Sequence, residues 1–465
     1  MKKIIGILLI ILLFLNGAGV SALLIRCPSL HQSSPGNEYD MVIIAPSLFS
    51  DALQSLIDHK NSHAIKTFLK TTEEIYQECE GRDNAEEIKY FIKDAIETYD
   101  ISYVLLVGGT GIIPIRQTKA YSETIAHSFI VHTDLYYADI YDTKGNFCSW
   151  NANNNTVYGE MNETKNKDGI DGFPDVRVGR FLSRTVSDVA VVVQKIINYE
   201  TQTFGSPWFH RAIALGGDTH VDPFFEFFTP FLLGVKGRLA FEGEYMGDVA
   251  AKYLQDFTFT KLYGNRWRKD AQYLTKDAVT DAINEGAGFL FVNTHGLTDR
   301  IMTHPPLNKN KWIPSPEGYT IHDIQHLNNQ DMLPVGVFCC CLTGYLDGVT
   351  YPISWEFIQH QQGGLIACFA LPESGQLEAG TLCTGVLTGH LAMGVVKSYA
   401  QGTVTVGDIW RETIEGYLND EFAMAFGDGS LSEHLISSMG IINNYYTIQN
   451  WVLLGDPTLQ IGGYS

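Results

Sequence analysis

Residues 288–296 read GFLFVNTHG and residues 334–341 read PVGVFCCC. Each stretch contains a short apolar run that predicts a buried strand, and each run leads directly into polar or nucleophilic side chains. In open α/β sheets, ligands bind outside the carboxyl ends of the strands. The two stretches therefore predict a sheet that carries His295 and the cysteine triplet on one functional face.

Strand and helix patterns alternate along the rest of the chain. The first series has strand patterns at 41–45, 63–69 and 102–109 and helix patterns at 50–60, 84–99 and 186–201. A second series follows a break near 204–207. Such alternation is typical of a mostly parallel sheet with helices on both faces. We therefore predict an α/β fold with two tandem subdomains, residues 39–204 and 205–465.

The charge balance bears on the kind of partner. The 465 residues include 32 Lys and Arg against 52 Asp and Glu, a net charge of −20. A surface field of this sign repels nucleic acid and anionic lipid, so nucleic-acid binding is disfavoured. Three of the eight cysteines are consecutive, which does not fit a regular disulfide framework.

The first 22 residues have the layout of a secretory signal. Lys2 and Lys3 precede an apolar run from Ile4 to Leu15, and small residues end at Ala22. We predict a signal peptide at 1–22, a short segment at 23–38, and a secreted or surface protein. The alternative is an uncleaved membrane anchor, because no charge occurs between Lys3 and Arg26.

The two strand ends suggest nucleophilic catalysis. An imidazole beside a thiol lowers the thiol pKa and can later protonate the leaving amine. One strand-helix-strand crossover could bring His295 and Cys341 together on neighbouring parallel strands. Gly296 lacks a Cβ, so its N–H could share an oxyanion hole with that of Cys341.

Two other interpretations of the cysteines stay open at this point. Free cysteines are commonly small buried hydrophobic residues, and His295-Gly296 could be an ordinary turn. A zinc site is disfavoured, because alternation along a strand lets only Cys339 and Cys341 point together and no C-x-x-C motif occurs.

A set of motifs in order along residues 39–461 resembles the gingipain-type cysteine peptidases. They are Tyr39-Asp40-Met41-Val42-Ile43-Ile44, Tyr103-Val104-Leu105-Leu106-Val107-Gly108-Gly109 with Ile113-Pro114, Thr133-Asp134-Leu135-Tyr136-Tyr137-Ala138-Asp139, Pro174-Asp175-Val176-Arg177-Val178-Gly179-Arg180, Lys195-Ile196-Ile197-Asn198-Tyr199-Glu200, Val292-Asn293-Thr294-His295-Gly296, Cys341-Leu342-Thr343-Gly344 and Leu454-Gly455-Asp456-Pro457-Thr458-Leu459. The resemblance implies a caspase-like three-layer sandwich.

The resemblance also implies site residues. The catalytic histidine of the family falls on His295 and its nucleophile on Cys341. The chain departs from the family pattern at Thr294 and Leu297, where the family usually has Gly and Ser, and at Cys339 and Cys340, where it often has small residues.

Acidic residues receive three weaker predictions. The resemblance makes Asp175 a candidate to orient His295, the alternative being a surface acid at a strand start. The acidic chain would suit a cation before the cleaved bond, recognised by Asp299, Asp347 or Glu373. Oxygen-rich residues at 142–175, with Asp168 and Asp171 at the centre, could hold a structural Ca²⁺, the alternative being a solvated acidic loop.

Together these observations predict an exported cysteine endopeptidase that hydrolyses protein or peptide substrates through an acyl-enzyme and requires no cofactor. It would contact a membrane only if the N-terminal segment is uncleaved. The alternatives are a catalytically silent relative that acts as an envelope binding or assembly module, and a transpeptidase that uses the same dyad.

Overall fold

The computed structural model describes residues 38–122, 127–162, 165–220, 240–348, 350–426 and 440–465. The predicted signal peptide, residues 1–22, lies outside the described residues, as does nearly all of 23–38. Within the described part of the chain, no helix is long and apolar enough to cross a bilayer.

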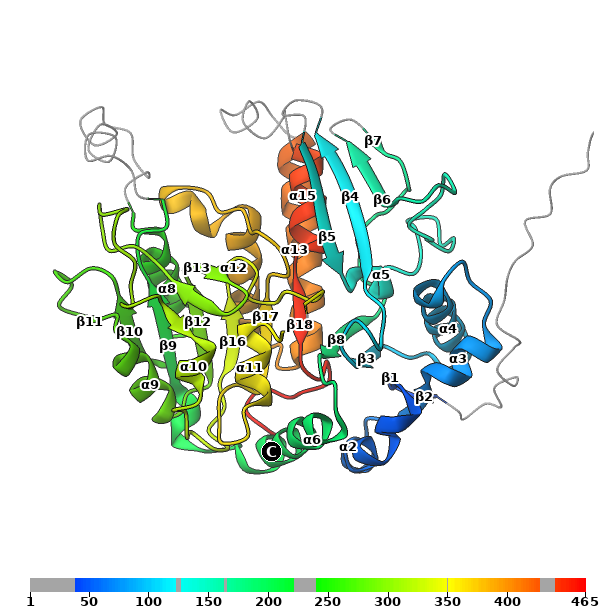
Figure 1. The fold of residues 1–465 in the computed structure, drawn as a ribbon, viewed down its shortest axis with the longest axis horizontal. Helices are drawn as coiled ribbons and strands as arrows, with labels where there is room; N and C mark the ends of the chain where they lie inside the picture. Colours follow the sequence, from blue (N-terminus) through cyan, green and yellow to red (C-terminus); the bar gives the residue numbers. More distant parts are fainter. Residues whose placement is uncertain (1–37, 123–126, 163–164, 221–239, 349, 427–439) are drawn as a thin grey trace, which may run out of the picture.

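An eleven-stranded sheet forms the centre of the molecule (Figure 1). All neighbouring strands are parallel except β17 and β18. The order across the sheet is β11 (Gln272–Tyr273), β10 (Thr258–Tyr263), β9 (Arg211–Gly216), β12 (Phe289–Asn293), β16 (Val335–Phe338), β17 (Ala367–Ala370), β18 (Val452–Leu454), β8 (Arg177–Phe181), β3 (Tyr103–Val107), β1 (Met41–Ala45) and β2 (Thr67–Thr71).

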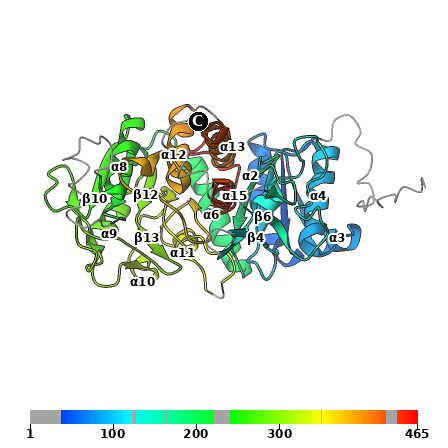
Figure 2. The same cartoon turned by 90° about the horizontal axis from the view of Figure 1, so that it is seen from above.

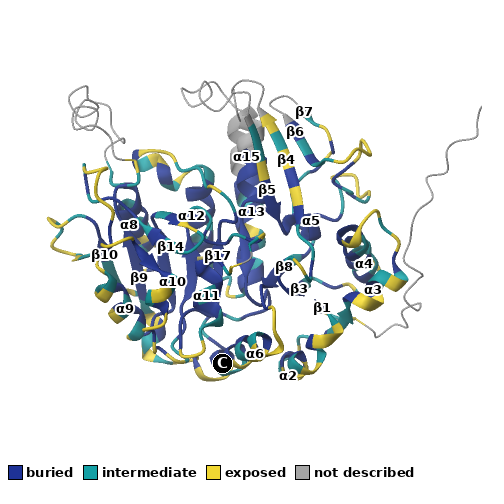
Figure 3. Cartoon of the chain, viewed as in Figure 1, coloured by how far each residue is buried: buried dark blue, intermediate teal, exposed yellow. Residues whose placement is uncertain are grey.

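The central strands are buried along their whole length (Figure 3). β1, β12 and β16 are near-continuous apolar runs, as expected for parallel strands with both faces covered. Seen from above, one face carries α8 (Glu242–Tyr253), α12 (Leu387–Ala400) and α13 (Val406–Phe426) (Figure 2). The other carries α9 (Lys276–Asn284), α10 (Ile321–Ile324) and α11 (Ile353–Gln359). The predicted α/β class, with helices on both faces, is confirmed.

Local signals explain where the long helices begin. The Asp83 side chain caps α4 (Asn84–Tyr99) by accepting the N–H of Glu86, and the helix ends at Asp100, which has a left-handed conformation. A Thr185/Asp188 capping box opens α6 (Val186–Gln202). Both helices begin where the sequence predicts, because the caps and the apolar stripe agree.

The β2 strand begins later than predicted. α2 (Ser50–Ser62) runs to Ser62 and a turn follows, in which Ala64 has a φ of 61°. The strand therefore spans Thr67–Thr71 rather than 63–69. α8 also differs, since it begins at Glu242 and not near Asp248.

A second sheet was missed in the sequence analysis. β4 (Arg116–Ser122), β5 (His127–Thr133), β6 (Tyr158–Asn162) and β7 (Lys165–Asn166) form four strands at the top of Figure 1, beside α15 (Gly440–Gln449). β6 and β7 lie within residues 142–175, for which the sequence analysis offered a solvated acidic loop as the alternative to a calcium site.

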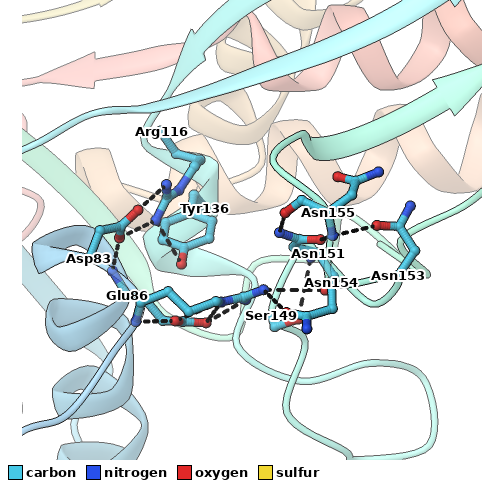
Figure 4. A network of polar contacts seen from close by, with 10 residues as sticks. Asp83, Glu86, Arg116, Tyr136, Ser149, Asn151, Asn153, Asn154 and Asn155 are labelled. Atoms are coloured by element: carbon cyan, nitrogen blue, oxygen red, sulfur yellow. Dashed lines mark hydrogen bonds and ion pairs between the residues drawn. The ribbon is translucent and has the colours of Figure 1, made fainter.

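Polar contacts hold β4 against the start of α4 and order the turn that follows Trp150 (Figure 4). Arg116 donates to both carboxylate oxygens of Asp83 at 2.9 and 2.8 Å, and also to the Tyr136 hydroxyl. The Asn151 side chain accepts the N–H of Asn155 at 2.9 Å and donates to its carbonyl at 2.7 Å. The asparagines therefore hold the turn that follows Trp150 through their own hydrogen bonds.

The last strand returns to the first half of the sheet. Residues 39–204 supply β1, β2, β3 and β8, whereas β18 from the C-terminal part pairs with both β17 and β8. The division into 39–204 and 205–465 stays a prediction.

Candidate active site

β12 and β16 are adjacent parallel strands at the centre of the sheet. Val292 pairs with Phe338, and the N–H of Cys339 donates to the Val292 carbonyl at 2.9 Å. Both strands end at the same edge of the sheet. Beyond that edge, His295 and Cys341 line one cleft of about 430 Å³. The structure therefore brings the two predicted side chains to the same site.

Cys341 is the accessible member of the triplet. Its side chain is partly exposed, whereas those of Cys339 and Cys340 are buried. Burial raises the pKa of Cys339 to about 12 and the pKa of Cys340 well above its usual value. Burial also raises the pKa of Cys341, but the N–H of Gly375 donates to its Sγ at 3.2 Å and acts in the opposite direction. Of the three thiols, only Cys341 combines access with a donor that stabilises the thiolate.

A sharp turn presents the Cys341 thiol. Leu342 has a φ of 60°, an uncommon conformation for a branched side chain, and its N–H donates to the Glu373 carbonyl at 3.1 Å. The turn and the segment that follows β17 therefore enclose the thiol from two sides.

Gly296 packs directly on the Cys341 backbone. A Cβ at this position would lie 2.5 Å from the Cys341 carbonyl oxygen and 3.1 Å from the Cys340 Cβ. This contact explains why glycine follows His295.

His295 is held by a backbone carbonyl. Its Nε2 lies 3.1 Å from the Thr219 oxygen, in the segment after β9, which leaves Nδ1 for chemistry. Burial lowers the pKa of His295, and the nearby His304 lowers it further. The free imidazole is therefore neutral at physiological pH and can accept a proton.

Asp175 does not take part in this arrangement. Its Oδ2 accepts the N–H groups of Ile140 and Tyr141 at 2.7 and 2.8 Å, just before β8. The Thr219 carbonyl holds the histidine instead, so the structure does not support an orienting role for Asp175.

The motifs, the fold and the site can now be compared with known proteins. A model of peptidase family C25 matches residues 34–462. The chain belongs to peptidase family C25.

Individual relatives in this family are distant. Gingipain R2 of Porphyromonas gingivalis is 21% identical over 310 residues, which cover 65% of this chain and 32% of that protein. The chain thus spans about a third of the length of the curated relative it matches. The crystal structure of the Arg-specific cysteine proteinase gingipain R is similar with a TM-score of 0.62 at 17% identity, covering 92% of this chain and 80% of that one. The complex of the Porphyromonas gingivalis RgpB pro- and mature domains is similar with a TM-score of 0.61 at 17% identity, covering 91% of this chain and 79% of that one. These structures confirm the caspase-like fold.

Glu242 supports the cleft from behind its lining residues, and the sequence analysis missed it. It is buried at the start of α8, and its Oε2 accepts the Thr219 N–H at 3.3 Å, the Thr219 hydroxyl at 3.2 Å and the His220 N–H at 3.2 Å. Its Oε1 accepts the Gly380 N–H at 2.7 Å. Glu242 therefore links the segment that holds His295 to the end of the 371–379 loop, which covers Cys341.

The acids expected to recognise a cation lie outside the cleft. Asp299 pairs with Arg300 at 2.7 Å, and Glu373 and Asp347 lie 2.7 and 3.5 Å from the two ring nitrogens of His132. Among the described residues, the only carboxylate that lines the cleft is the exposed Glu378. These three acids therefore provide no support for a preference for a cationic residue before the cleaved bond.

The candidate calcium ligands are engaged by backbone donors. Asp168 accepts the Glu160 N–H at 2.7 Å and Asp171 accepts the Phe173 N–H at 3.0 Å. Across the described ranges, no group of three or more His, Cys, Asp or Glu side chains could hold a metal ion. The structure therefore provides no ligand cluster for the predicted Ca²⁺, which stays an untested prediction.

Gly296→Ala should destabilise the protein by about 1–3 kcal/mol, because the added methyl group meets backbone atoms that cannot move independently. Chemical denaturation of the variant measures this loss. Gly111→Ala is the matched control, since a Cβ there would meet no atom within 4 Å. Equal stability of the Gly296 variant and the control would contradict the close packing.

Proposed function

We propose that this chain is an exported cysteine endopeptidase that cleaves protein or peptide substrates through Cys341 and His295. The proposal rests mainly on one observation: the only partly exposed free thiol in the described part of the chain shares a cleft with a half-buried histidine whose Nδ1 is available. Membership of peptidase family C25 supports the reaction class.

The directions of the pKa shifts favour a neutral resting pair. The Cys341 thiol keeps its proton and the His295 imidazole lacks one, since burial raises the pKa of the first and lowers the pKa of the second. His295 therefore acts as a general base as the thiol attacks, rather than standing as the partner of a preformed thiolate.

The proposed reaction proceeds in two halves. The thiol proton passes to Nδ1 of His295 as the Cys341 Sγ bonds to the peptide carbonyl carbon, and the N–H groups of Gly296 and Cys341 stabilise the oxyanion. The C–N bond then breaks and the imidazolium gives its proton to the leaving amine. Water, deprotonated by the same imidazole, attacks the thioester and releases the acid and the thiol.

Export is supported by the N-terminal signal pattern and by one cysteine. Cys79 is disulfide-bonded, and structural disulfides persist mainly in oxidising compartments. Mass spectrometry of the mature protein should find Leu23 at or near its N-terminus, whereas an intact membrane-embedded Met1 form would favour an anchor.

Selective alkylation tests the nucleophile without any assumption about substrate. Iodoacetamide at neutral pH should modify Cys341 far faster than the buried Cys368 or Cys383, as read by peptide mapping. A peptide library then gives the cleavage profile, with Cys341→Ala as control. Alkylation of Cys341 without cleavage would favour the silent binding module, and products joined to added amines would favour a transpeptidase.

Activity should decrease as the pH falls through the pKa of His295, because a protonated imidazole cannot accept the thiol proton. Burial lowers this pKa below the ordinary histidine value of 6.5, so the ring stays neutral to a lower pH than an exposed histidine. The acid limb of kcat/KM should therefore have its midpoint below pH 6.5. A midpoint above that value would contradict a half-buried, neutral His295 as the base.

A further inference from the structure

His295 also contacts an aromatic residue outside the cleft that it shares with Cys341. The indole of Trp312 lies edge-on to the His295 ring, with centroids 5.4 Å apart and an interplanar angle of 78°. Trp312 does not line the cleft with Cys341. The imidazole therefore contacts an aromatic side chain that is not part of the cleft lining.

Trp312 is both held in place and exposed. Its ring lies 3.8 Å from that of His304, whose Nδ1 is 2.8 Å from the Lys311 carbonyl oxygen. Even so, 41% of Trp312 is accessible to solvent. An ordered tryptophan that keeps this much apolar surface in water beside a reactive imidazole is a suitable platform for a ligand side chain.

Leu297 is a second exposed apolar residue near His295. It lies two residues after His295 in β13 (His295–Leu297), so the two side chains share one face of the strand. It is 42% exposed. An exposed leucine and an exposed tryptophan thus border the histidine.

The proposed chemistry says which part of a substrate would reach this surface. The acyl portion stays on Cys341, whereas His295 must give a proton to the departing amine. The residue that begins with that amine must therefore pass against the imidazole. This step rests on the proposed function.

We infer that Trp312 and Leu297 form an apolar subsite for the side chain immediately after the cleaved bond. Substrates with a large aliphatic or aromatic residue at that position are favoured over those with glycine or aspartate. Apolar pockets of this kind discriminate by roughly 10–200-fold for modest changes in side-chain size.

A peptide series that varies only after the cleaved bond tests the inference. The parent is the best substrate from the library, with Leu, Phe, Gly or Asp at that position. Wild-type kcat/KM should be at least about tenfold higher for Leu and Phe than for Gly. Trp312→Ala should reduce this ratio to about twofold by lowering the rates for Leu and Phe, while Trp312→Phe should retain most of it.

Two controls separate recognition from a structural role. Trp267→Ala removes a tryptophan that is 78% exposed and is not among the residues that line the cleft, and it should leave the ratio unchanged. Iodoacetamide alkylation of Cys341 involves no leaving group, so Trp312→Ala should leave its rate within about twofold. A Trp312→Ala effect that is equal for all four peptides would overturn the inference and assign Trp312 to shielding His295 from water.

Binding distinguishes failure of this inference from failure of the proposed function. Fluorescence anisotropy with the Cys341→Ala variant should show tighter binding of the Leu peptide than of the Gly peptide. The Cys341→Ala/Trp312→Ala double variant should bind the two peptides equally. Equal binding by Cys341→Ala would overturn the subsite even if the wild type cleaves peptides. If the wild type cleaves no library peptide, the proposed hydrolysis is wrong, whereas a wild type that cleaves peptides without preferring Leu over Gly overturns the subsite alone.

Discussion

Cys341→Ala is expected to abolish hydrolysis while leaving the fold intact. The substitution removes the only thiol of the triplet that is partly exposed and accepts the N–H of Gly375, and neither neighbour can replace it. Cys339 and Cys340 are buried, and burial holds their pKa values far above neutral, so they stay protonated. Initial rates on the best library substrate, with a thermal melt to verify folding, measure the effect.

The matched controls are Cys339→Ala and Cys340→Ala. Each should retain activity within about tenfold of the wild type, a difference of about 1.4 kcal/mol in the barrier. Cys340→Ala should also lower stability somewhat, because its Sγ lies 3.6 Å from the Thr343 hydroxyl in a fully packed region. Full activity in Cys341→Ala, or inactivation only in Cys340→Ala with its fold preserved, would show that the nucleophile is wrongly assigned.

The centre of the sheet was predictable because its signals are local. β12 and β16 are short apolar runs buried on both faces, and a chemically reactive side chain follows each of them. Such a run can form little other than a central strand, and the carboxyl ends of parallel strands meet at one edge. The adjacency of His295 and Cys341 therefore follows from two nine-residue or shorter stretches of sequence.

The parts that were missed depend on contacts between distant segments. β4 reads Arg-Gln-Thr-Lys-Ala-Tyr-Ser, a polar sequence that becomes a strand only by pairing with β5 and β6. The Thr219 carbonyl that holds His295 is a backbone group, so no side-chain motif marks it. Glu242 lies far along the chain from both the Thr219 segment and Gly380, and it resembles any acid in the first turn of a helix.

The suggested role of Asp175 in orienting His295 lacks structural support for a related reason. An acid at the start of a strand can either reach a distant histidine or satisfy nearby backbone donors. Here two N–H groups, those of Ile140 and Tyr141, occupy the carboxylate. Leaving backbone N–H groups unpaired in a buried turn costs free energy of folding, so the side chain points to these nearby donors.

His295→Ala should reduce hydrolysis about as severely as Cys341→Ala. Without the imidazole, the Cys341 thiol has no base. A free cysteine has a pKa of about 8.5, and burial raises the pKa of the Cys341 thiol. Only a small fraction is then ionised at neutral pH, and the leaving amine has no proton donor. Single-turnover rates on the same peptide measure both defects, and His322→Ala, an exposed histidine on α10, should behave as wild type.

Combining the two substitutions tests whether the residues act as one unit. The Cys341→Ala/His295→Ala variant should be scarcely slower than either single variant, because each substitution alone already removes the shared proton transfer. Residues that contribute independently would instead multiply their losses. A double variant slower by the product of the two single effects would contradict a dyad and indicate that His295 acts on the substrate separately from Cys341.

Alkylation separates the roles of the two residues further. His295→Ala should slow iodoacetamide modification of Cys341 at neutral pH, because the base that assists the thiol is gone. At a pH high enough to ionise the thiol, the rate of modification should recover.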